Sequence, residues 1–157
     1  MTTGHLRDAE PRDLDQLLEI ERAQFPEPWT RGMLLDEISQ RDTRRYRVWD
    51  NAGEILGYAG VMFVLGDELH LNSIATKPGW EGAGIARLLM DDLVEDARRR
   101  GVARGTLEVA VSNERAQRLY RHYGFAPVGV RRGYYGASGE DALIMWAHFD
   151  DTVANDS

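Results

Sequence analysis

The chain has 157 residues, 43% of them hydrophobic, and this length and composition suit one domain with one core. It contains no cysteine, which excludes disulfides, cysteine-ligated zinc and a cysteine acyl-enzyme. The 26 acidic and 19 basic residues give a net charge of −7, which argues against nucleic-acid binding and favours either plain solubility, a cationic substrate or a basic protein partner.

The N-terminal third is predicted to form a short strand and two helices. The strand is expected at 5–10, and a helix follows it because Pro11 suits the first position of a helix. Two prolines within 25–29 end that helix. Thr30 then fits the N-cap of a second helix that reaches about Ser39.

Three strands are predicted next, separated by turn-forming residues. They are expected at 44–49, 55–65 and 68–76. Alternation along the third strand places Glu68, His70 and Asn72 on one face.

The C-terminal half is predicted to alternate strands with two helices. A glycine-rich turn opens the first of these helices, whose buried stripe is expected to be Ile85, Leu88, Leu89, Leu93 and Ala97. Ser112 or Asn113 is expected to cap the second helix, which Gly124 ends. The remaining strands are expected at 105–111, 125–130 and 142–149. We therefore expect a single domain over 1–150 and a frayed polar tail over 151–157.

The order of these elements predicts an α+β fold. Three consecutive strands before a crossover helix imply a mixed sheet, whereas a doubly wound fold would alternate strand and helix throughout. No stretch approaches the roughly 20 apolar residues that cross a bilayer, and the polar N-terminus lacks the apolar centre of a signal peptide. We expect a cytoplasmic protein without a membrane partner.

The centre of the chain is the glycine-rich turn within 77–87, which opens a helix. A helix start carries unpaired N–H groups and partial positive charge, so it suits an anion. A P-loop string is absent, and a dinucleotide fingerprint would have Arg87 in its third glycine slot. The pyrophosphate of coenzyme A and a tight turn without any ligand both remain open.

Several motifs accompany this turn and carry a resemblance to a known family. They are Glu81-Gly82-Ala83-Gly84-Ile85-Ala86, Leu107-Glu108-Val109, Asn113, and Ala116-x-x-Leu119-Tyr120-x-x-x-Gly124-Phe125. Together they resemble the GCN5-related N-acetyltransferase (GNAT) superfamily, whose element order fits residues 4 to 149. The resemblance implies a three-layer α+β fold with a mixed, mostly antiparallel seven-stranded sheet and about four helices. It also implies acetyl-CoA as cosubstrate and no metal.

One position departs from the superfamily pattern. Glu81 stands where Gln or Arg is usual, and a carboxylate there would repel a pyrophosphate unless its side chain points away.

Within the superfamily the chain resembles the bacterial ribosomal-protein alanine N-acetyltransferases of the RimI type. The additional motifs that support this are Phe25-Pro26, Pro28-Trp29, Arg131-Arg132-x-Tyr134-Tyr135 and Glu140-Asp141-Ala142-x-Ile144-Met145. Ala110 stands where that type usually has Arg.

The resemblance implies that Glu108 is the general base of the acetyl transfer. We expect its apolar neighbours in the strand to raise the pKa of its carboxyl toward a useful value. Glu68 and His70 are competing bases on the preceding strand, and all three residues are alternatively solvent-facing or paired strand residues. Tyr120 is the expected general acid for the leaving thiolate, or else a core residue of its helix.

The remaining site residues follow from the same resemblance. The expected cofactor contacts are Ile74, Ala75 and Thr76 along the pantetheine arm, Gly82, Ala83, Gly84, Ile85, Ala86 and Arg87 around the pyrophosphate, and Asn113. The expected substrate contacts are Phe25, Trp29, Tyr134 and Tyr135, which are alternatively surface aromatic packing. Asn113 is alternatively only an N-cap.

The implied function is acetylation of the N-terminal α-amine of a protein, most simply the N-terminal alanine of a ribosomal protein. The pKa of an α-amine is about 8 and that of a lysine side chain is about 10.4, so a moderately basic carboxylate suits the α-amine better. Two alternatives stay open. One is an acetyltransferase for a small amine or a lysine side chain, and the other is an acyl-CoA-binding module without turnover.

Overall fold

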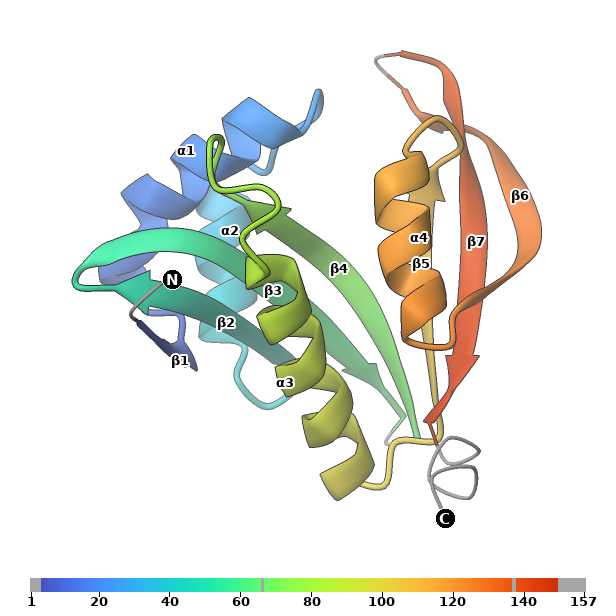
Figure 1. The fold of residues 1–157 in the computed structure, drawn as a ribbon, viewed down its shortest axis with the longest axis horizontal. Coiled ribbons are helices and arrows are strands. Elements are labelled where there is room, and N and C mark those ends of the chain that lie inside the picture. The colour runs from blue at the N-terminus through green and yellow to red at the C-terminus, as the bar shows by residue number, and fades with distance from the viewer. Residues whose placement is uncertain (1–3, 66, 137, 150–157) are drawn as a thin grey trace. The chain divides into compact units, whose positions relative to one another are not determined.

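The computed structural model describes residues 4–65, 67–136 and 138–149. The predicted tail at 151–157 lies outside the described residues. These residues contain four α-helices and seven strands, and the strands make one sheet in the order β1-β2-β3-β4-β5-β7-β6 (Figure 1). The β4–β5 pair is parallel, whereas β1–β2, β2–β3, β5–β7 and β6–β7 are antiparallel. The mixed, mostly antiparallel seven-stranded sheet expected from the sequence is therefore confirmed.

The chain divides into two compact units. The first comprises Met1–Met62 and Asn72–Asp91, and the second comprises Phe63–Leu71 and Asp92–Ser157. Strands β3 (Glu54–Val64) and β4 (Glu68–Thr76) and helix α3 (Ile85–Arg99) pass from one unit into the other. The predicted bounds of β4 agree with the structure at both ends.

The first unit begins with a strand and a capped helix pair. Its remaining elements are β1 (His5–Asp8), the 3-10 turn Pro11–Asp13, α1 (Leu14–Gln24), α2 (Arg31–Ser39) and β2 (Arg44–Asn51). The hydroxyl of Thr30 accepts a hydrogen bond from the backbone N–H of Met33 at 3.2 Å, which confirms the predicted N-cap. Pro11 opens the 3-10 turn that leads into α1, as its fixed φ favours.

Helices cover both faces of the sheet in the first unit. Tyr58 of β3 belongs to the core cluster that also contains Leu17 of α1 and Leu34 of α2. The neighbouring Gly57 points to the opposite face, where an added Cβ would lie 2.7 Å from the side chain of Ile85 in α3. Glycine is required there because α3 lies so close to β3. Figure 1 shows α1 and α2 behind β2 and β3, with the start of α3 in front.

The second unit is built on three strands and α4. Its elements, besides its parts of β3, β4 and α3, are β5 (Arg104–Ala110), α4 (Glu114–His122), β6 (Ala126–Tyr135) and β7 (Glu140–His148). Edge-to-face contacts join Tyr120 to Phe125 and Phe125 to Phe149, with ring centroids 6.1 and 6.2 Å apart. This aromatic row joins Tyr120 of α4 to the residues that adjoin the start of β6 and the end of β7.

Strand β6 is longer than the sequence predicts. It was expected at 125–130 but runs from Ala126 to Tyr135, and nearly all of its residues are exposed. An exposed edge strand needs no alternation of apolar and polar residues, so its second half gives no strand pattern. Tyr134 and Tyr135 therefore lie on a strand. No helix within the described residues is long and apolar enough to cross a membrane.

Candidate active site

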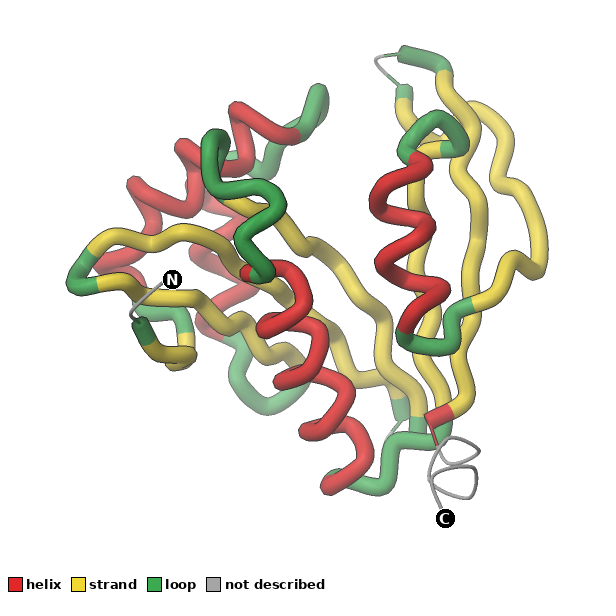
Figure 2. The backbone as a smooth tube through the Cα atoms, in the orientation of Figure 1, coloured by secondary structure: helices red, strands yellow, loops and turns green. Residues whose placement is uncertain are grey.

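The glycine turn lies in the first unit and runs from the end of β4 to the start of α3, drawn as a loop in Figure 2. Gly79, Gly82 and Gly84 have φ values of +92°, +84° and +86°, which side chains disfavour. The first i→i−4 bond runs from Leu88 N to Gly84 O at 3.1 Å. The amides of 85–87 precede that bond, so they are the groups that a helix start offers to an anion.

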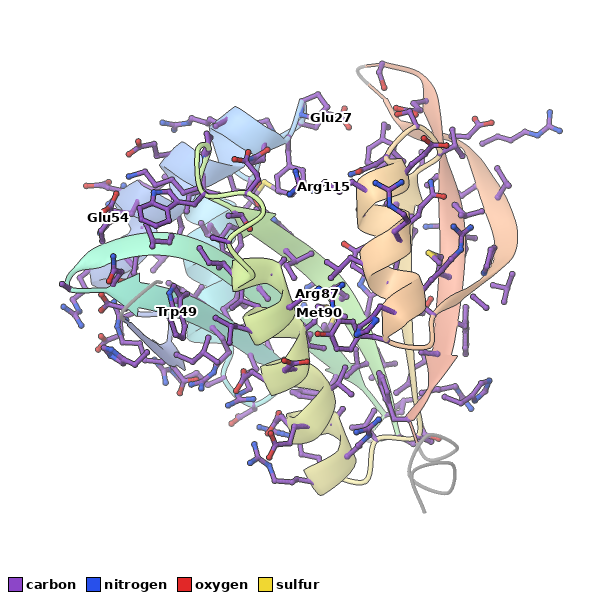
Figure 3. The ribbon with its side chains drawn as sticks, viewed as in Figure 1. Glu27, Trp49, Glu54, Arg87, Met90 and Arg115 are labelled. Atoms are coloured by element: carbon purple, nitrogen blue, oxygen red, sulfur yellow. The ribbon has the colours of Figure 1, made fainter. Side chains whose placement is uncertain are left out.

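The surface of the turn fits a phosphate ligand. Residues 81–84 are exposed, and a Cβ added at Gly79 or Gly84 would meet no heavy atom within 4 Å. The start of the turn is held by Lys77, whose ammonium donates to Glu54 of β3 at 2.6 Å. Glu54 and the exposed Arg87 of the first helical turn are labelled in Figure 3. The open backbone and the helix start together suit a pyrophosphate.

Glu81 turns back onto the first half of the turn. Its Oε1 accepts a hydrogen bond from the Gly79 N–H at 2.7 Å, and its Oε2 accepts one from Gln24 Nε2 at 3.2 Å. The same Gln24 nitrogen donates to the carbonyl of Thr76 at 2.7 Å. Glu81 therefore has a structural role, because its hydrogen bonds link the turn to α1. Thr76 is one of the residues whose backbone groups are expected to contact the cofactor, and its carbonyl accepts this internal hydrogen bond.

Phe25 and Trp29 pack against the core of the first unit, so they have a structural role there. The backbone N–H of Trp29 donates to Glu21 Oε2 at 3.0 Å, and its indole N–H donates to the hydroxyl of Ser73 at 3.0 Å. Glu21 is 1% exposed and also accepts a hydrogen bond from the hydroxyl of Tyr58. Burial raises the pKa of the Glu21 carboxyl to about 7, although the Trp29 N–H opposes the shift. The sequence patterns predict no role for this buried acid of α1.

Glu108 is the centre of a polar cluster in the second unit. Its Oε2 lies 2.8 Å from His70 Nε2, and its Oε1 lies 3.1 Å from the same nitrogen. The hydroxyl of Tyr134 donates to Oε1 at 3.4 Å, and Arg131 Nη1 lies 3.7 Å from that oxygen. The Glu108 side chain is 12% exposed. Three residues from β4 and β6 thus meet at this carboxylate of β5.

The expected rise in the pKa of Glu108 is wrong. The hydrogen bond from His70 holds the pKa of the Glu108 carboxyl below its ordinary value, against the opposing effect of burial. The charges of His70 and Arg131 lower it further. The apolar neighbours Leu107 and Val109 are buried on the opposite face of β5, because successive strand residues alternate. They therefore do not surround the carboxylate.

The two competing bases have different partners. Glu68 accepts a hydrogen bond from Arg104 Nε at 2.8 Å, so this carboxylate is held in an ion pair. His70 instead lies against Glu108. The predicted alternation of β4 is confirmed, since Glu68, His70 and Asn72 are half-buried and Leu69 and Leu71 are buried.

Tyr120 is buried on α4 in the second unit, with 7% of its surface exposed. Burial raises the pKa of its phenol, and the neighbouring Tyr135 phenol adds to the rise. Tyr120 therefore keeps its proton at neutral pH. Asn113 caps α4 by accepting a hydrogen bond from Ala116 N at 3.2 Å, which confirms its N-cap role.

The two aromatic residues of β6 lie beside this cluster. The rings of Tyr134 and Tyr135 meet edge to face with centroids 5.0 Å apart. The guanidinium of Arg131 lies 5.5 Å from the Tyr134 ring centroid. Burial raises the pKa of Tyr135 to about 12, and the nearby Tyr134 and Glu108 contribute. The second unit thus brings together Glu108, Tyr134 and Tyr135, and adds Arg131, to which the sequence assigned no site role.

Comparison with known proteins gives consistent similarities over most of the chain. The model of the acetyltransferase (GNAT) family matches residues 14–125. A Bacillus subtilis (strain 168) protein is 35% identical over 150 residues, which are 96% of this chain and 99% of that protein. The ribosomal protein bS18-alanine N-acetyltransferase of Escherichia coli (strain K12) is 33% identical over 138 residues, 87% of this chain and 91% of its own.

A solved structure is also similar to this chain over most of its length. The crystal structure of the ribosomal-protein-S18-alanine N-acetyltransferase from Escherichia coli superposes with a TM-score of 0.85. Its sequence is 31% identical, and the match covers 94% of each chain. The similarity therefore extends through both units of this chain.

Proposed function

The chain belongs to the acetyltransferase (GNAT) family, whose members use acetyl-CoA, and we propose that it acetylates the N-terminal alanine of ribosomal protein bS18. The observation that carries the choice of substrate is the match to the Escherichia coli enzyme of that name, which extends over 91% of the enzyme's length. A match of that extent reaches well beyond the glycine turn, which supports the choice.

In this proposal the glycine turn is the cofactor anchor. The amides of Gly82 to Arg87 would bind the pyrophosphate, and backbone groups of 74–76 would pair with the pantetheine arm. Asn113 would be a further cofactor contact. Acetyl-CoA supplies the activated acetyl thioester. The support from this chain is the open turn surface and the positive φ of Gly82 and Gly84.

Proton removal from the amine is assigned to Glu108. The ammonium of an N-terminal residue has a pKa of about 8, roughly two units below the pKa of a lysine side chain. Because His70 and Arg131 hold the pKa of the Glu108 carboxyl low, this carboxylate is a weak base. A weak base favours the less basic α-amine over a lysine side chain. Its negative charge would also attract the cationic N-terminus.

Tyr120 is the proposed acid for the departing thiolate. Its phenol is buried, and the raised pKa keeps the proton available at neutral pH. Phe25, Trp29, Tyr134 and Tyr135 are the proposed contacts of the substrate peptide. Among these, Tyr134 has support from its hydrogen bond to Glu108.

A peptide panel tests the proposal. The purified chain is incubated with acetyl-CoA and peptides that begin with Ala, Ser or Met, including the N-terminal sequence of bS18, and the products are identified by mass spectrometry. The matched control is each peptide with its α-amine already acetylated. We expect one acetyl group on the α-amine of the bS18 peptide. The absence of α-acetylation on every peptide would contradict the proposal.

The panel also separates the alternatives. Polyamines, aminoglycosides and α-blocked peptides that contain lysine test the small-amine and lysine activities. A binding module would instead bind coenzyme A in calorimetry without releasing thiol in the presence of any amine. Glu108→Gln and Tyr120→Phe variants test the two assigned residues, because unchanged thiol release in both would contradict their roles.

A further inference from the structure

The contact between His70 and Glu108 is set by the backbone of the second unit. Strands β4 and β5 are parallel, and His70 lies beside Thr106 in their register. Glu108 is two residues further along β5, so its side chain emerges on the same face. Both carboxylate oxygens lie within 3.1 Å of His70 Nε2. Each side chain thus projects from a paired strand toward the other.

The two oxygens of Glu108 have different surroundings. Oε2 makes the short contact of 2.8 Å with His70. Oε1 has longer contacts, 3.1 Å from His70 Nε2, 3.4 Å from the Tyr134 hydroxyl and 3.7 Å from Arg131 Nη1. Arg131 is 58% exposed, so its charge is partly screened by water. Oε1 is therefore the oxygen better suited to meet a substrate ammonium, while Oε2 stays with the imidazole.

The chemistry requires more than an isolated carboxylate. The ordinary pKa of a carboxyl is about four units below that of an α-ammonium. The equilibrium for proton transfer from the ammonium to a carboxylate is therefore unfavourable by about 10⁴-fold. An imidazole ordinarily titrates about one and a half units below the α-ammonium, which reduces the penalty to about 30-fold. A carboxylate in contact with an imidazole can use the stronger base as the final acceptor.

We propose that Glu108 and His70 form a proton relay, with His70 as the residue on which the substrate's proton comes to rest. The N–H bond of the ammonium breaks as an O–H bond forms at Glu108 Oε1. A proton then passes from the carboxyl to His70 Nε2. For this step His70 is neutral and carries its own proton on Nδ1, so its Nε2 accepts the proton that the carboxyl gives up. After the transfer Nε2 is the donor of the hydrogen bond to the ionised carboxylate. The products are a neutral amine, an ionised Glu108 and an imidazolium paired with it. This inference rests on the proposed function, since it concerns the same amine substrate.

In this relay His70 acts through Glu108 as a positioning and proton-storing residue. The charged and titratable groups around the pair are Arg131, Tyr134 and Tyr135 of β6, Glu68 of β4 and Arg104 of β5. Glu68 and Arg104 form their own ion pair at 2.8 Å. Arg131 opposes the accumulation of positive charge on His70. Ionised Glu108 compensates for it and holds the imidazolium in place.

The first test is the pH dependence of kcat and kcat/KM for His70→Gln, measured with the amine that the panel identifies. Glutamine keeps a hydrogen bond to Glu108 but cannot accept a proton. We expect kcat at pH 7 to fall by about 10- to 100-fold, with the KM for acetyl-CoA unchanged and the ascending limb of the profile displaced. His148→Gln, at the exposed end of β7, is the matched control. A His70→Gln profile that superimposes on the wild type, with equal kcat, would overturn the relay.

A second variant separates the relay from two independent catalytic effects. Glu108→Gln and the double variant His70→Gln, Glu108→Gln are measured together. Two members of one relay give a double variant about as slow as the slower single variant. Fully multiplicative losses would overturn the relay.

The last test does not depend on the substrate. If no amine in the panel is acetylated, the proposed function fails, and the coupling of the pair is then measured by NMR titration of the histidine side chains. The resonance of His70 is identified by its loss in His70→Gln. We expect its titration midpoint to move to lower pH by about one unit in Glu108→Gln, because a neighbouring negative charge favours the imidazolium. An unchanged midpoint would overturn the coupling.

Discussion

Gln24 and Glu81 are bound to one another at the glycine turn, with Gln24 Nε2 lying 3.2 Å from Glu81 Oε2. The other oxygen of Glu81 holds the N–H of Gly79. These contacts explain why a carboxylate is tolerated beside the proposed phosphate site. Its two hydrogen bonds orient it toward the start of the turn and α1. The negative charge nevertheless remains on the turn.

Replacing Glu81 with Gln is therefore expected to tighten the binding of coenzyme A. Glutamine keeps an acceptor for Gly79 and removes one negative charge, which at a distance of several ångströms in water changes affinity by about 2- to 5-fold. Calorimetry at low salt measures the dissociation constant. The gain should shrink at about 0.5 M salt, where such charges are screened. Weaker binding by Glu81→Gln would instead show that the turn needs the ionised carboxylate of Glu81 to keep its conformation.

Substitution of Gly84 with Ala is expected to weaken both the fold and cofactor binding. Gly84 has a φ of +86°, while an added Cβ meets no atom within 4 Å, so the cost is that of the backbone alone. A left-handed alanine costs about 1–2 kcal/mol, which lowers the Tm of a chain this size by roughly 2–8 °C. Gly32→Ala is the control, since it lies in α2 with open space around it and should raise the Tm. Equal Tm changes in the two variants would contradict the strain.

Much of the fold could be predicted from local sequence patterns. Strand β4, the Thr30 cap and the Asn113 cap depend on residues near one another in the chain, and all three are confirmed. The second half of β6 could not be predicted, because an exposed edge strand leaves no alternating pattern. Local rules thus succeed where the structural cause is itself local.

The electrostatics of the candidate site could not be predicted in the same way. The neighbours of Glu108 in the sequence are apolar, but its neighbours in space are His70, 38 residues away, and Arg131, 23 residues away. Strand pairing brings these residues together, and a single sequence does not reveal its register. The assignment of Glu108 as general base stays a prediction, whereas the expected direction of its pKa shift is wrong.

Glu21 is expected to make the stability of the chain depend on pH. Its pKa is raised from 4.5 to about 7, so the folded state binds the proton more tightly than the unfolded state. Stability should therefore decrease as pH rises from about 4.5 to 7, by roughly 3 kcal/mol in total. Urea unfolding at pH 5 and pH 8 measures this loss, and Glu21→Gln should remove it. Glu19→Gln, on the exposed side of α1, is the control and should behave like the wild type.

Arg7 is expected to be a large contributor to the stability of the first unit. Its guanidinium makes two hydrogen bonds of 2.8 Å to the buried Asp13 and one of 2.9 Å to the buried Asp50. Arg7→Met removes the guanidinium from both carboxylates, which keep only backbone donors, and should cost about 3–5 kcal/mol at pH 7 by urea unfolding. Exposed Arg12→Met is the control, with an expected loss below about 0.5 kcal/mol.

The cost of Arg7→Met should itself depend on pH. The hydrogen bond from Arg7 holds the pKa of Asp50 below its ordinary value, so its contribution is complete above that ordinary value. It is lost as the pH falls through the lowered pKa. The difference between wild type and variant should therefore be smaller at pH 3 than at pH 7. A constant difference would mean that packing of the arginine stem, rather than charge, carries the effect.

Tyr120→Phe separates the proposed acid from a core residue. The variant keeps the ring that packs edge to face on Phe125 at 6.1 Å and removes only the hydroxyl. We expect the Tm to change by less than about 3 °C, because little packing is lost. The kcat for thiol release should fall by about 10²-fold or more, the usual contribution of a positioned acid. Tyr123→Phe, on the half-buried next turn of the chain, is the control and should keep full activity. If Tyr120→Phe keeps its kcat, the hydroxyl is not the acid, and protonation of the thiolate must come from water.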